Sequence, residues 1–330
     1  MLDLKRKENK NRIRNKKGEI EKYIFFVAIL IVPLVQFLIF YAGVNINSIL
    51  LSLKEYDGNN YVWNTKGLFE NYTRFFTGVL GGTPEGVSGR ELELFQLLPQ
   101  AAKNSLVQYL VSLLIILPLG IIVSYYIYSS IPGGGFFKIL LMTPQIVSGM
   151  VFVIIFKYLY SYGFRDWFEN LPDLYAWTGK PTQFYVVMCY DAFFSLAANL
   201  ILYLGAMANV DKSVMEYGDI DGLKSLGKLW HIVLPTIWPT VIVFIMSGIA
   251  SFFTSQGSLF SFFGDADGTL SEESYTLGYW MFIKVYKQGS ITNFQGLPQA
   301  AAAGVSFTLI AAPLVLLCKW ALEKFGPRED

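Results

Sequence analysis

The chain has 330 residues, of which 53% are hydrophobic and only 15% are charged, and its formal net charge is +1. An average soluble domain carries about 25% charged residues, so this composition excludes an ordinary soluble protein and indicates one that spans a membrane. Both cysteines, Cys189 and Cys318, lie in apolar segments, so no disulfide framework is predicted.

The amino-terminal segment 1–22 is strongly basic and precedes the first apolar run. A basic run can bind nucleic acid, but beside a membrane segment it is typical of the cytoplasmic side. The apolar run Tyr23–Gly43 is long enough to cross a bilayer, and no small-residue cleavage pattern follows it. We therefore expect a cytoplasmic amino terminus, a retained membrane helix and no nucleic-acid partner.

Further apolar segments predict an all-α membrane protein with about six spans. The five that follow the first are Lys103–Tyr128, Lys138–Tyr162, Phe184–Asn209, Ile237–Phe263 and Pro298–Trp320, which form a core over residues 103–320. The loop 44–102 carries turn signals and acidic residues, so it is expected to be solvated and partly structured, and the cytoplasmic amino terminus places it outside the cell. Basic residues are more numerous on the side of the amino terminus, which places the tail 321–330 in the cytoplasm as well.

The short segment Tyr275–Tyr286 is rich in aromatic residues but too short to span a bilayer. Aromatic side chains are enriched at membrane–water interfaces. We therefore expect an interfacial helix that leads into the last span.

The segment 210–236, between the fourth and fifth spans, is predicted to form two short helices. Gly222 can adopt the left-handed conformation that ends a helix, while Pro235 and Pro239 are expected to stop the second helix before the fifth span. Apolar residues recur at helical spacing on one face, and they are Val214, Tyr217, Leu223, Leu226 and Trp230. This face predicts a soluble partner that binds the helix pair.

This segment resembles the EAA loop of ABC importer permeases. The matching residues are Glu216, Gly222, Ile232, Leu234 and Pro235, and Asp221 and Pro239 match the branch that includes the maltose, glycerol-3-phosphate and oligosaccharide permeases. Further matches are the outer-loop element Leu68–Tyr72, Asn104 in the second span and the run Ala300–Gly304 in the last span. Tyr217 and Gly218 replace the two alanines of the pattern. Compared with the family pattern, the docking surface is therefore expected to be bulkier at Tyr217 and more loosely packed at Gly218.

The resemblance implies the architecture of a type I ABC importer permease in a bacterial cytoplasmic membrane, forming half of the pathway for a sugar or oligosaccharide. It implies a second, related permease, two ATPase subunits, and an extracellular or lipid-anchored solute-binding protein as partners. The residues that would couple to the ATPase are Glu216, Tyr217, Gly218, Asp221, Gly222, Ile232, Leu234 and Pro235. A polyol or glycerol phosphodiester stays open as the solute, and a secondary transporter is the alternative class, although no inverted repeat is visible.

The chain itself is expected to be neither an enzyme nor a metal or cofactor protein. Residues Gly222–Leu229 fit a phosphate-binding loop except at the last position, where Leu229 replaces the Ser or Thr that holds magnesium. ATP and magnesium are therefore expected in the partner ATPase. His231, the only histidine, has no Cys or His nearby in the sequence, so we interpret it as an interface residue and not a metal ligand.

Two ionisable residues, Lys157 and Asp191, lie inside predicted spans, where charges are costly and usually paired or functional. At 1.5 Å per residue both lie about 10 Å below the outer surface, so a mutual ion pair and a contact with the solute both stay open. By resemblance, the solute cavity lies between the fourth and fifth spans. The candidates there are Asp191, Phe194, Ser195, Asn199, Ser251, Phe252, Ser255 and Gln256, with ordinary helix packing as the alternative for each.

Overall fold

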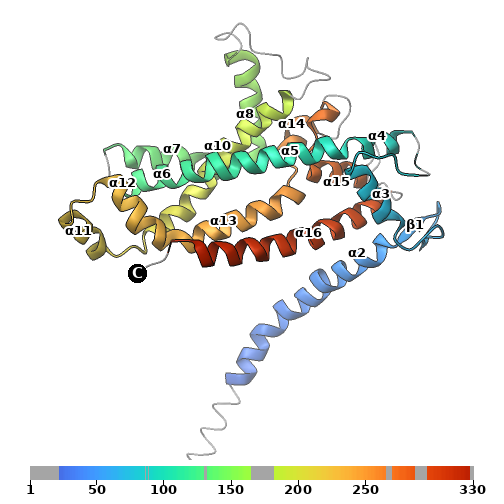
Figure 1. Cartoon of the computed structure of the whole chain (residues 1–330), viewed down its shortest axis with the longest axis horizontal. Helices are drawn as coiled ribbons and strands as arrows, with labels where there is room; N and C mark the ends of the chain where they lie inside the picture. The colour runs from blue at the N-terminus through green and yellow to red at the C-terminus, as the bar shows by residue number, and fades with distance from the viewer. Residues whose placement is uncertain are drawn as a thin grey trace, which may run out of the picture.

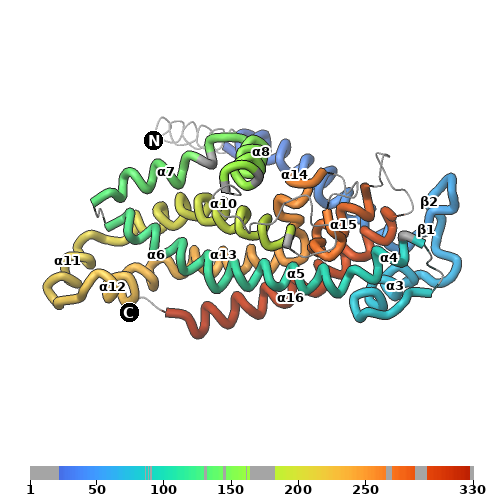
Figure 2. The backbone as a smooth tube through the Cα atoms, turned by 90° about the horizontal axis from the view of Figure 1, so that it is seen from above, coloured from blue at the N-terminus to red at the C-terminus, as the bar shows by residue number. Residues whose placement is uncertain are grey.

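The computed structural model describes residues 22–85, 87, 89–129, 132–164, 182–264, 270–286 and 296–327. Almost all of the basic segment 1–22 therefore lies outside the described residues. Within them, five helices are long and apolar enough to cross a membrane, and they are Lys22–Ser52, Glu91–Tyr128, Gln183–Met207, Ser225–Thr254 and Gly296–Phe325. The last four run along the long axis of the molecule as a bundle (Figures 1 and 2).

The first membrane helix extends beyond its predicted end at Gly43. A π-helical turn, η1 (Phe37–Gly43), joins it to α2 (Val44–Ser52) without a break. The α2 end packs against α16 (Gly296–Phe325), and the rest leaves the bundle at an angle with its apolar side chains exposed (Figure 1). Lipid or another protein must cover this surface, because exposed apolar residues in such number are not stable in water.

The predicted outer loop is a small structured region at one end of the bundle. It contains an antiparallel hairpin of β1 (Lys54–Tyr56) and β2 (Tyr61–Trp63), followed by α3 (Glu70–Val79) and α4 (Arg90–Gln96). Asn71 ties α3 to the end of the first helix, because its amide donates hydrogen bonds to the carbonyls of Ser52 (2.9 Å) and Lys54 (2.8 Å). The outer-loop element identified in the sequence therefore anchors this region.

The third predicted span, Lys138–Tyr162, is not one continuous helix. The structure divides it into α7 (Gly134–Ile146), α8 (Gly149–Tyr158) and the π-helical turn η3 (Leu159–Phe164). Val147 and Ser148 between α7 and α8 have extended backbones, with ψ of 145° and 131°. The stretch Val147–Gly149 combines a β-branched residue, a serine and a glycine, which are weak helix formers, and α8 projects away from the bundle (Figure 1).

The helix of the fifth span, predicted at Ile237–Phe263, begins earlier and ends earlier than expected. The short helix α12 (Ser225–Lys228), the π-helical turn η4 (Leu229–Val233) and α13 (Leu234–Thr254) form one continuous helix, so the two prolines do not interrupt it. Pro235 lies in the first turn of α13, after η4 has shifted the bonding so that Leu234 N–H donates to the carbonyl of Leu229. The same arrangement precedes Pro118, where η2 (Ser112–Ile116) joins α5 (Leu98–Val111) to α6 (Leu117–Tyr128).

At its other end, α13 stops at Thr254 and not at Phe263. Ser255 is extended, Gly257 has a φ of +58°, and a separate short helix, α14 (Leu259–Phe263), follows. Gln256 therefore lies in a turn and not in a membrane helix. A positive φ is a conformation that glycine adopts without strain, so Gly257 permits this change of direction.

The expected interfacial helix is buried inside the protein instead. The 3₁₀ turn η5 (Glu272–Ser274) precedes α15 (Leu277–Val285), which packs against α5, α13 and α16. Trp280 is fully buried and donates a hydrogen bond to the carbonyl of Leu94 (2.6 Å). At Gly278 an added Cβ would collide with the backbone of Thr254, so close packing and not the aromatic content decides where this helix lies.

Two buried apolar clusters occupy opposite ends of the bundle. The hairpin-side cluster is mainly aromatic and includes Phe75, Phe95, Tyr279, Trp280 and Phe307. The loop-side cluster is smaller, and consists of Ile121, Tyr125, Tyr203, Met207, Leu229, Val233, Ile237 and Val241. Buried residues of α16, among them Ala300 and Ala303, are small enough for α15 to pack closely on that helix.

Candidate functional site

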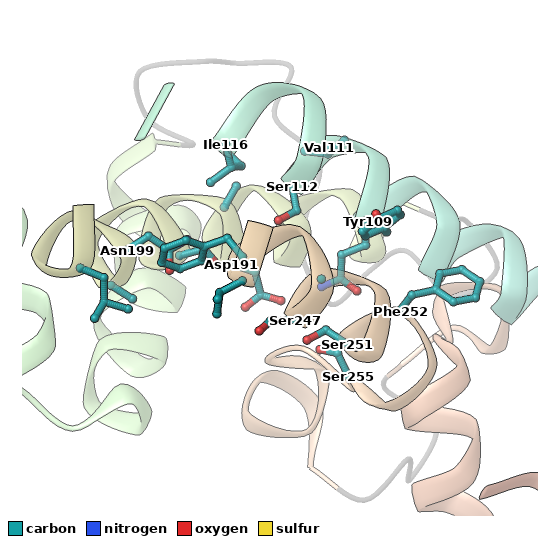
Figure 3. A pocket seen from close by; sticks show the side chains of 18 of the residues that line it. Tyr109, Val111, Ser112, Ile116, Asp191, Asn199, Ser247, Ser251, Phe252 and Ser255 are labelled. Carbon is teal, nitrogen blue, oxygen red and sulfur yellow. The ribbon is translucent and has the colours of Figure 1, made fainter. Parts of the chain in front are cut away.

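A cavity of about 860 Å³ lies between the two clusters, bounded by α5 and η2, by α10 (Thr182–Met207) and by α13 (Figure 3). Its volume is in the range that holds small-molecule ligands. Residues four apart lie on the same face of a helix, and two such series line the cavity. These series are Asp191, Ser195 and Asn199 on α10, and Ser247 and Ser251 on α13 with Ser255 directly after its end.

Six of the eight residues proposed for the solute pathway line this cavity. Phe194 does not, because its ring packs against Phe152 (5.1 Å between centroids) and Tyr190 (4.7 Å) beside the hairpin-side cluster. Gln256 also lies outside the lining, and its Oε1 atom is buried without a hydrogen-bond partner in the described part of the chain.

The sequence analysis missed the wall that α5 and η2 contribute. Its polar lining residues are Ser105, Gln108, Tyr109 and Ser112. Ser105, Gln108 and Ser112 recur at spacings of three and four residues, which places them on one face of the predicted span, and this spacing was the available signal. The ring of Tyr109 lies 3.0 Å from the position that a Cβ on Gly248 would take, so the absence of a side chain there lets α5 approach α13.

Of the two possibilities that the sequence leaves open for Lys157 and Asp191, a mutual ion pair is not among the contacts of the described residues. Lys157 donates a hydrogen bond to the carbonyl of Phe262 and lies near the rings of Phe262 (5.8 Å) and Phe263 (5.9 Å). Asp191 instead accepts hydrogen bonds from the hydroxyl (2.6 Å) and backbone N–H (3.2 Å) of Ser258. Both side chains therefore bind the segment 258–263. The depth of each residue along its helix, which was all that the sequence provided, could not predict these partners.

The loop 210–236 forms a compact helical hairpin at the other end of the bundle (Figure 2). Its first helix, α11 (Lys212–Ile220), begins at Asp211, whose side chain accepts a bond from Ser213 N–H (3.0 Å). Hydrogen bonds from Ser213 lower the pKa of this exposed carboxyl. Gly222 ends the helix with a φ of +74°, and Leu223 N–H donates to the carbonyl of Gly218 (2.9 Å).

Gly218 is buried and does not loosen a docking surface as the sequence suggested. A Cβ at this position would lie 2.8 Å from Cδ1 of Ile232, so the glycine faces the second half of the loop. By contrast Tyr217 is 66% exposed, and Glu216 is exposed beside it. The exposed apolar side chains form what we call the loop surface, and they are Val214, Tyr217, Ile220, Leu226 and Trp230.

The resemblance to a phosphate-binding loop does not extend to the structure. Helix α11, and no strand, precedes Gly222, and the ammonium of Lys228 forms an ion pair with Asp219. His231 is exposed, and its Nδ1 lies 3.0 Å from the carbonyl of Gly227. Among the residues that the structure describes, no three His, Cys, Asp or Glu side chains are grouped so that they could hold a metal ion.

Comparisons with known proteins identify the family of the chain. Residues 116–330 match the family described as the binding-protein-dependent transport system inner membrane component. The multiple sugar-binding transport system permease protein MsmF of Streptococcus mutans is 24% identical over 205 residues, which are 61% of this chain and 68% of that protein. The arabinooligosaccharides transport system permease protein AraP of Bacillus subtilis is 25% identical over 188 residues, or 53% of this chain and 55% of AraP.

The fold is also that of a solved transporter subunit. A chain from the crystal structure of a bacterial ABC transporter involved in the import of the acidic polysaccharide alginate superimposes with a TM-score of 0.70. The superposition covers 94% of this chain and 98% of that one, at 16% sequence identity. The chain therefore belongs to the family of binding-protein-dependent transport system inner membrane components, as a multi-pass permease with the fold of an ABC importer subunit.

Proposed function

We propose that this chain forms half of the pathway for a carbohydrate in an ATP-driven importer of a bacterial cytoplasmic membrane. The cavity is the observation that carries the proposal, because three helices line it with hydroxyl, amide and aromatic groups. Hydroxyls and amides form hydrogen bonds with sugar hydroxyls, and the rings of Tyr109 and Phe252 offer apolar surfaces to a sugar ring. The names of MsmF and AraP point to the same class of solute.

Uptake by cells tests this proposal directly. A strain that lacks the chain, and the same strain with the chain restored, would be given a panel of labelled neutral and acidic oligosaccharides, polyols and glycerol phosphodiesters. We expect at least one saccharide to enter only the restored strain. Uptake restricted to a polyol or a phosphodiester, or no difference between the strains for any saccharide, would refute the carbohydrate assignment.

The loop surface is proposed to bind a cytoplasmic ATPase, which would hold ATP and magnesium. Two of its exposed apolar residues, Val214 and Tyr217, lie on the same short helix as the exposed Glu216, and a protein interface typically combines such apolar groups with polar ones. The second half of the loop continues into α13 without a break, so a movement of the loop reaches the cavity through one helix.

Proline substitutions at two matched glycines test the coupling. Gly222 and Gly58 both have positive φ values, +74° and +108°, and neither has another atom within 4 Å of an added Cβ. Proline cannot adopt either conformation, so both turns must rearrange. We expect Gly222→Pro, like Glu216→Lys, to raise the ATP consumed per solute imported while the protein still inserts into the membrane. Gly58→Pro should leave this ratio unchanged, and equal ratios in all variants would contradict the assignment.

The remaining partners are a second, related permease, which would complete the pathway, a second ATPase subunit, and an extracellular or lipid-anchored binding protein that delivers the solute. Apolar side chains of the first helix, α7 and α8 are widely exposed, and membrane lipid or the second permease would cover them. Native mass spectrometry of the purified importer tests this composition. We expect one copy of each permease with two ATPase subunits, and a complex built on this chain alone would contradict it.

A further inference from the structure

Among the described residues that line the cavity, a single one carries a formal charge. The described lining residues include one carboxylate, Asp191, and no lysine, arginine or histidine. Asp191 lies at the end of the cavity that is farther from the loop 210–236, beside Ser255 at the end of α13. The inner end is lined by apolar and neutral polar residues, among them Ala206, Phe244 and Asn209, so the charge of Asp191 is confined to the other end of the cavity.

The structure fixes this carboxylate but leaves it able to bind a ligand. Ser258 donates one hydrogen bond to Oδ1 (2.6 Å) and one to Oδ2 (3.2 Å). Each carboxylate oxygen can accept two hydrogen bonds, so each retains one free acceptor position. Burial of the charge is therefore partly compensated by the protein, and a hydroxyl donor from a solute can supply more compensation.

Gly257 determines how closely the turn after α13 approaches Asp191. An added Cβ at Gly257 would lie 2.5 Å from Oδ2 of Asp191 and 3.3 Å from Nε2 of Gln108. The carboxylate of Asp191 and the amide of Gln108 therefore face the same glycine, and they come from two different helices. Ser255 belongs to the same turn, and its hydroxyl oxygen accepts a bond from Gly257 N–H (3.1 Å), so its own proton is available for donation.

We propose that these groups form a carboxylate subsite, consisting of Gln108, Asp191, Ser251 and Ser255, which selects an uncharged saccharide and rejects anionic solutes. The inference rests on the proposed import of carbohydrates and names the class of carbohydrate. Neighbouring hydroxyls of a neutral sugar can donate to the carboxylate and accept from the amide and the serines. An acidic sugar or a phosphodiester would bring a second negative charge against Asp191 at low local dielectric, where repulsion is strong.

The charge of the subsite can be measured without knowing the solute. In a full importer whose Cys189 and Cys318 are replaced by alanine, Ser247→Cys provides a reporter in the cavity lining one turn from Ser251. Its modification rates by a cationic (trimethylammonium) and an anionic (sulfonate) methanethiosulfonate reagent would be compared. We expect the cationic reagent to react faster than the anionic one. The ratio of the cationic rate to the anionic rate should fall at least about threefold when Asp191→Asn is added, because the local negative potential is removed.

A second reporter provides the matched control. Asn209→Cys lies at the opposite end of the cavity lining, eighteen residues from Asp191 in sequence, or about 27 Å along a helix. This separation is several times the Debye length of about 8 Å at physiological salt. The rate ratio at this reporter should not respond to Asp191→Asn. An unchanged ratio at Ser247→Cys, or equal changes at both reporters, would overturn the proposal.

Uptake by the importer, together with its binding protein, tests the consequence for solutes. Neutral malto-, xylo- and arabino-oligosaccharides would be compared with oligogalacturonates and sn-glycerol 3-phosphate. We expect import of a neutral member only, and a loss of at least about tenfold in Asp191→Asn, because a hydrogen bond to a charged group is removed. Cys189→Ala, on the exposed side of the same helix, should import normally, and the amounts of both variants in the membrane should match that of the unaltered protein.

The two proposals fail differently. Import of an acidic saccharide by the unaltered protein would refute the charge selection and leave carbohydrate import intact. If no saccharide enters at all, carbohydrate import fails, and the two reporter ratios still decide whether Asp191 sets the charge of the cavity.

Discussion

The hairpin-side and loop-side clusters differ in the number of elements that they join. The hairpin-side cluster holds together the outer helices α3 and α4 with α5, α8, α10, α13, α14, α15 and α16, whereas the loop-side cluster joins only α6, α10, η4 and α13. Regions with fewer buried contacts open and shift at lower free-energy cost. The comparison indicates that the hairpin side is the fixed part of the permease, and that the loop side is the part able to move with its partner.

The largest expected effect comes from truncation at the centre of the hairpin-side cluster. Trp280 is fully buried between Phe75 and Phe95, with a hydrogen bond to Leu94. Trp280→Ala should lower the free energy of unfolding by about 3–5 kcal/mol, measured by denaturation of the purified protein in detergent. Trp63→Ala on the exposed hairpin should change it by no more than about 0.5 kcal/mol. Similar losses of unfolding free energy in both variants would contradict the view that the hairpin-side cluster is the fixed part of the permease.

A buried ammonium on the same side predicts a pH dependence. Lys284 is buried on α15, donates to Oε1 of Gln299 (2.8 Å) and lies 3.7 Å from Glu91. Burial lowers its pKa from 10.5 to about 8, although Glu91 opposes the shift. Between these two values the folded protein binds fewer protons than the unfolded chain, so stability should rise with pH.

This rise is expected to reach about 3 kcal/mol across the full window, since one pKa unit corresponds to about 1.4 kcal/mol. Denaturation midpoints of the unaltered protein and of Lys284→Met would be compared from pH 7.5 to 10.5. The variant lacks the titrating group and should show a flatter curve. Parallel curves would mean that Lys284 keeps its ordinary pKa in the folded state.

On the loop side, Leu229 and Leu226 lie three residues apart, one buried and the other exposed. Substitutions at these two positions therefore test protein stability and partner binding separately. Leu229 is 7% exposed and Leu226 is 72% exposed. Leu229→Ala should cost about 2 kcal/mol, at the low end for such truncations because a small cluster can collapse around the gap. Leu226→Ala should leave stability unchanged and weaken binding of the partner ATPase. If Leu226→Ala lowered stability and Leu229→Ala weakened partner binding instead, the assignment of the loop surface to the side of Leu226 would be wrong.

The smallest expected effect concerns the contact between the two halves of the loop. Gly218→Ala brings a Cβ to 2.8 Å from Cδ1 of Ile232, but this methyl ends a flexible side chain that can move. The substitution should cost less than about 1 kcal/mol, and Ile232→Val should relieve it by removing the methyl. A double-mutant cycle on thermal stability measures this coupling, and additive effects would show that the two residues do not touch.

Features set by local sequence were predictable. Long apolar runs indicated most of the membrane helices, and Gly222 correctly predicted the end of the first short helix of the loop, whereas the second helix continues into the fifth span. Features that depend on distant contacts were not. Asn104 and Gln108 lie one turn apart on α5, yet Asn104 donates to the carbonyls of Glu273 (2.7 Å) and Tyr275 (2.9 Å), while Gln108 lines the cavity.

The same limit explains the other differences. An aromatic segment such as Tyr275–Tyr286 is equally suited to an interface and to a core, and its burial depends on the close approach at Gly278. The break in the third span and the separation of Lys157 from Asp191 also arise from packing. Composition and spacing define which side chains are available, but the tertiary contacts decide which of them meet.

The continuous helix Ser225–Thr254 has a mechanical consequence. Its 30 residues measure about 45 Å, and it is held near its middle by Val233, Ile237 and Val241 of the loop-side cluster. Its far end is held as well, because Phe253 lies in the hairpin-side cluster. A tilt imposed on α12 by a docking partner would therefore be taken up between the two clusters, where Ser247 and Ser251 line the cavity, so the cavity wall would bend while the far end of the helix stays in place.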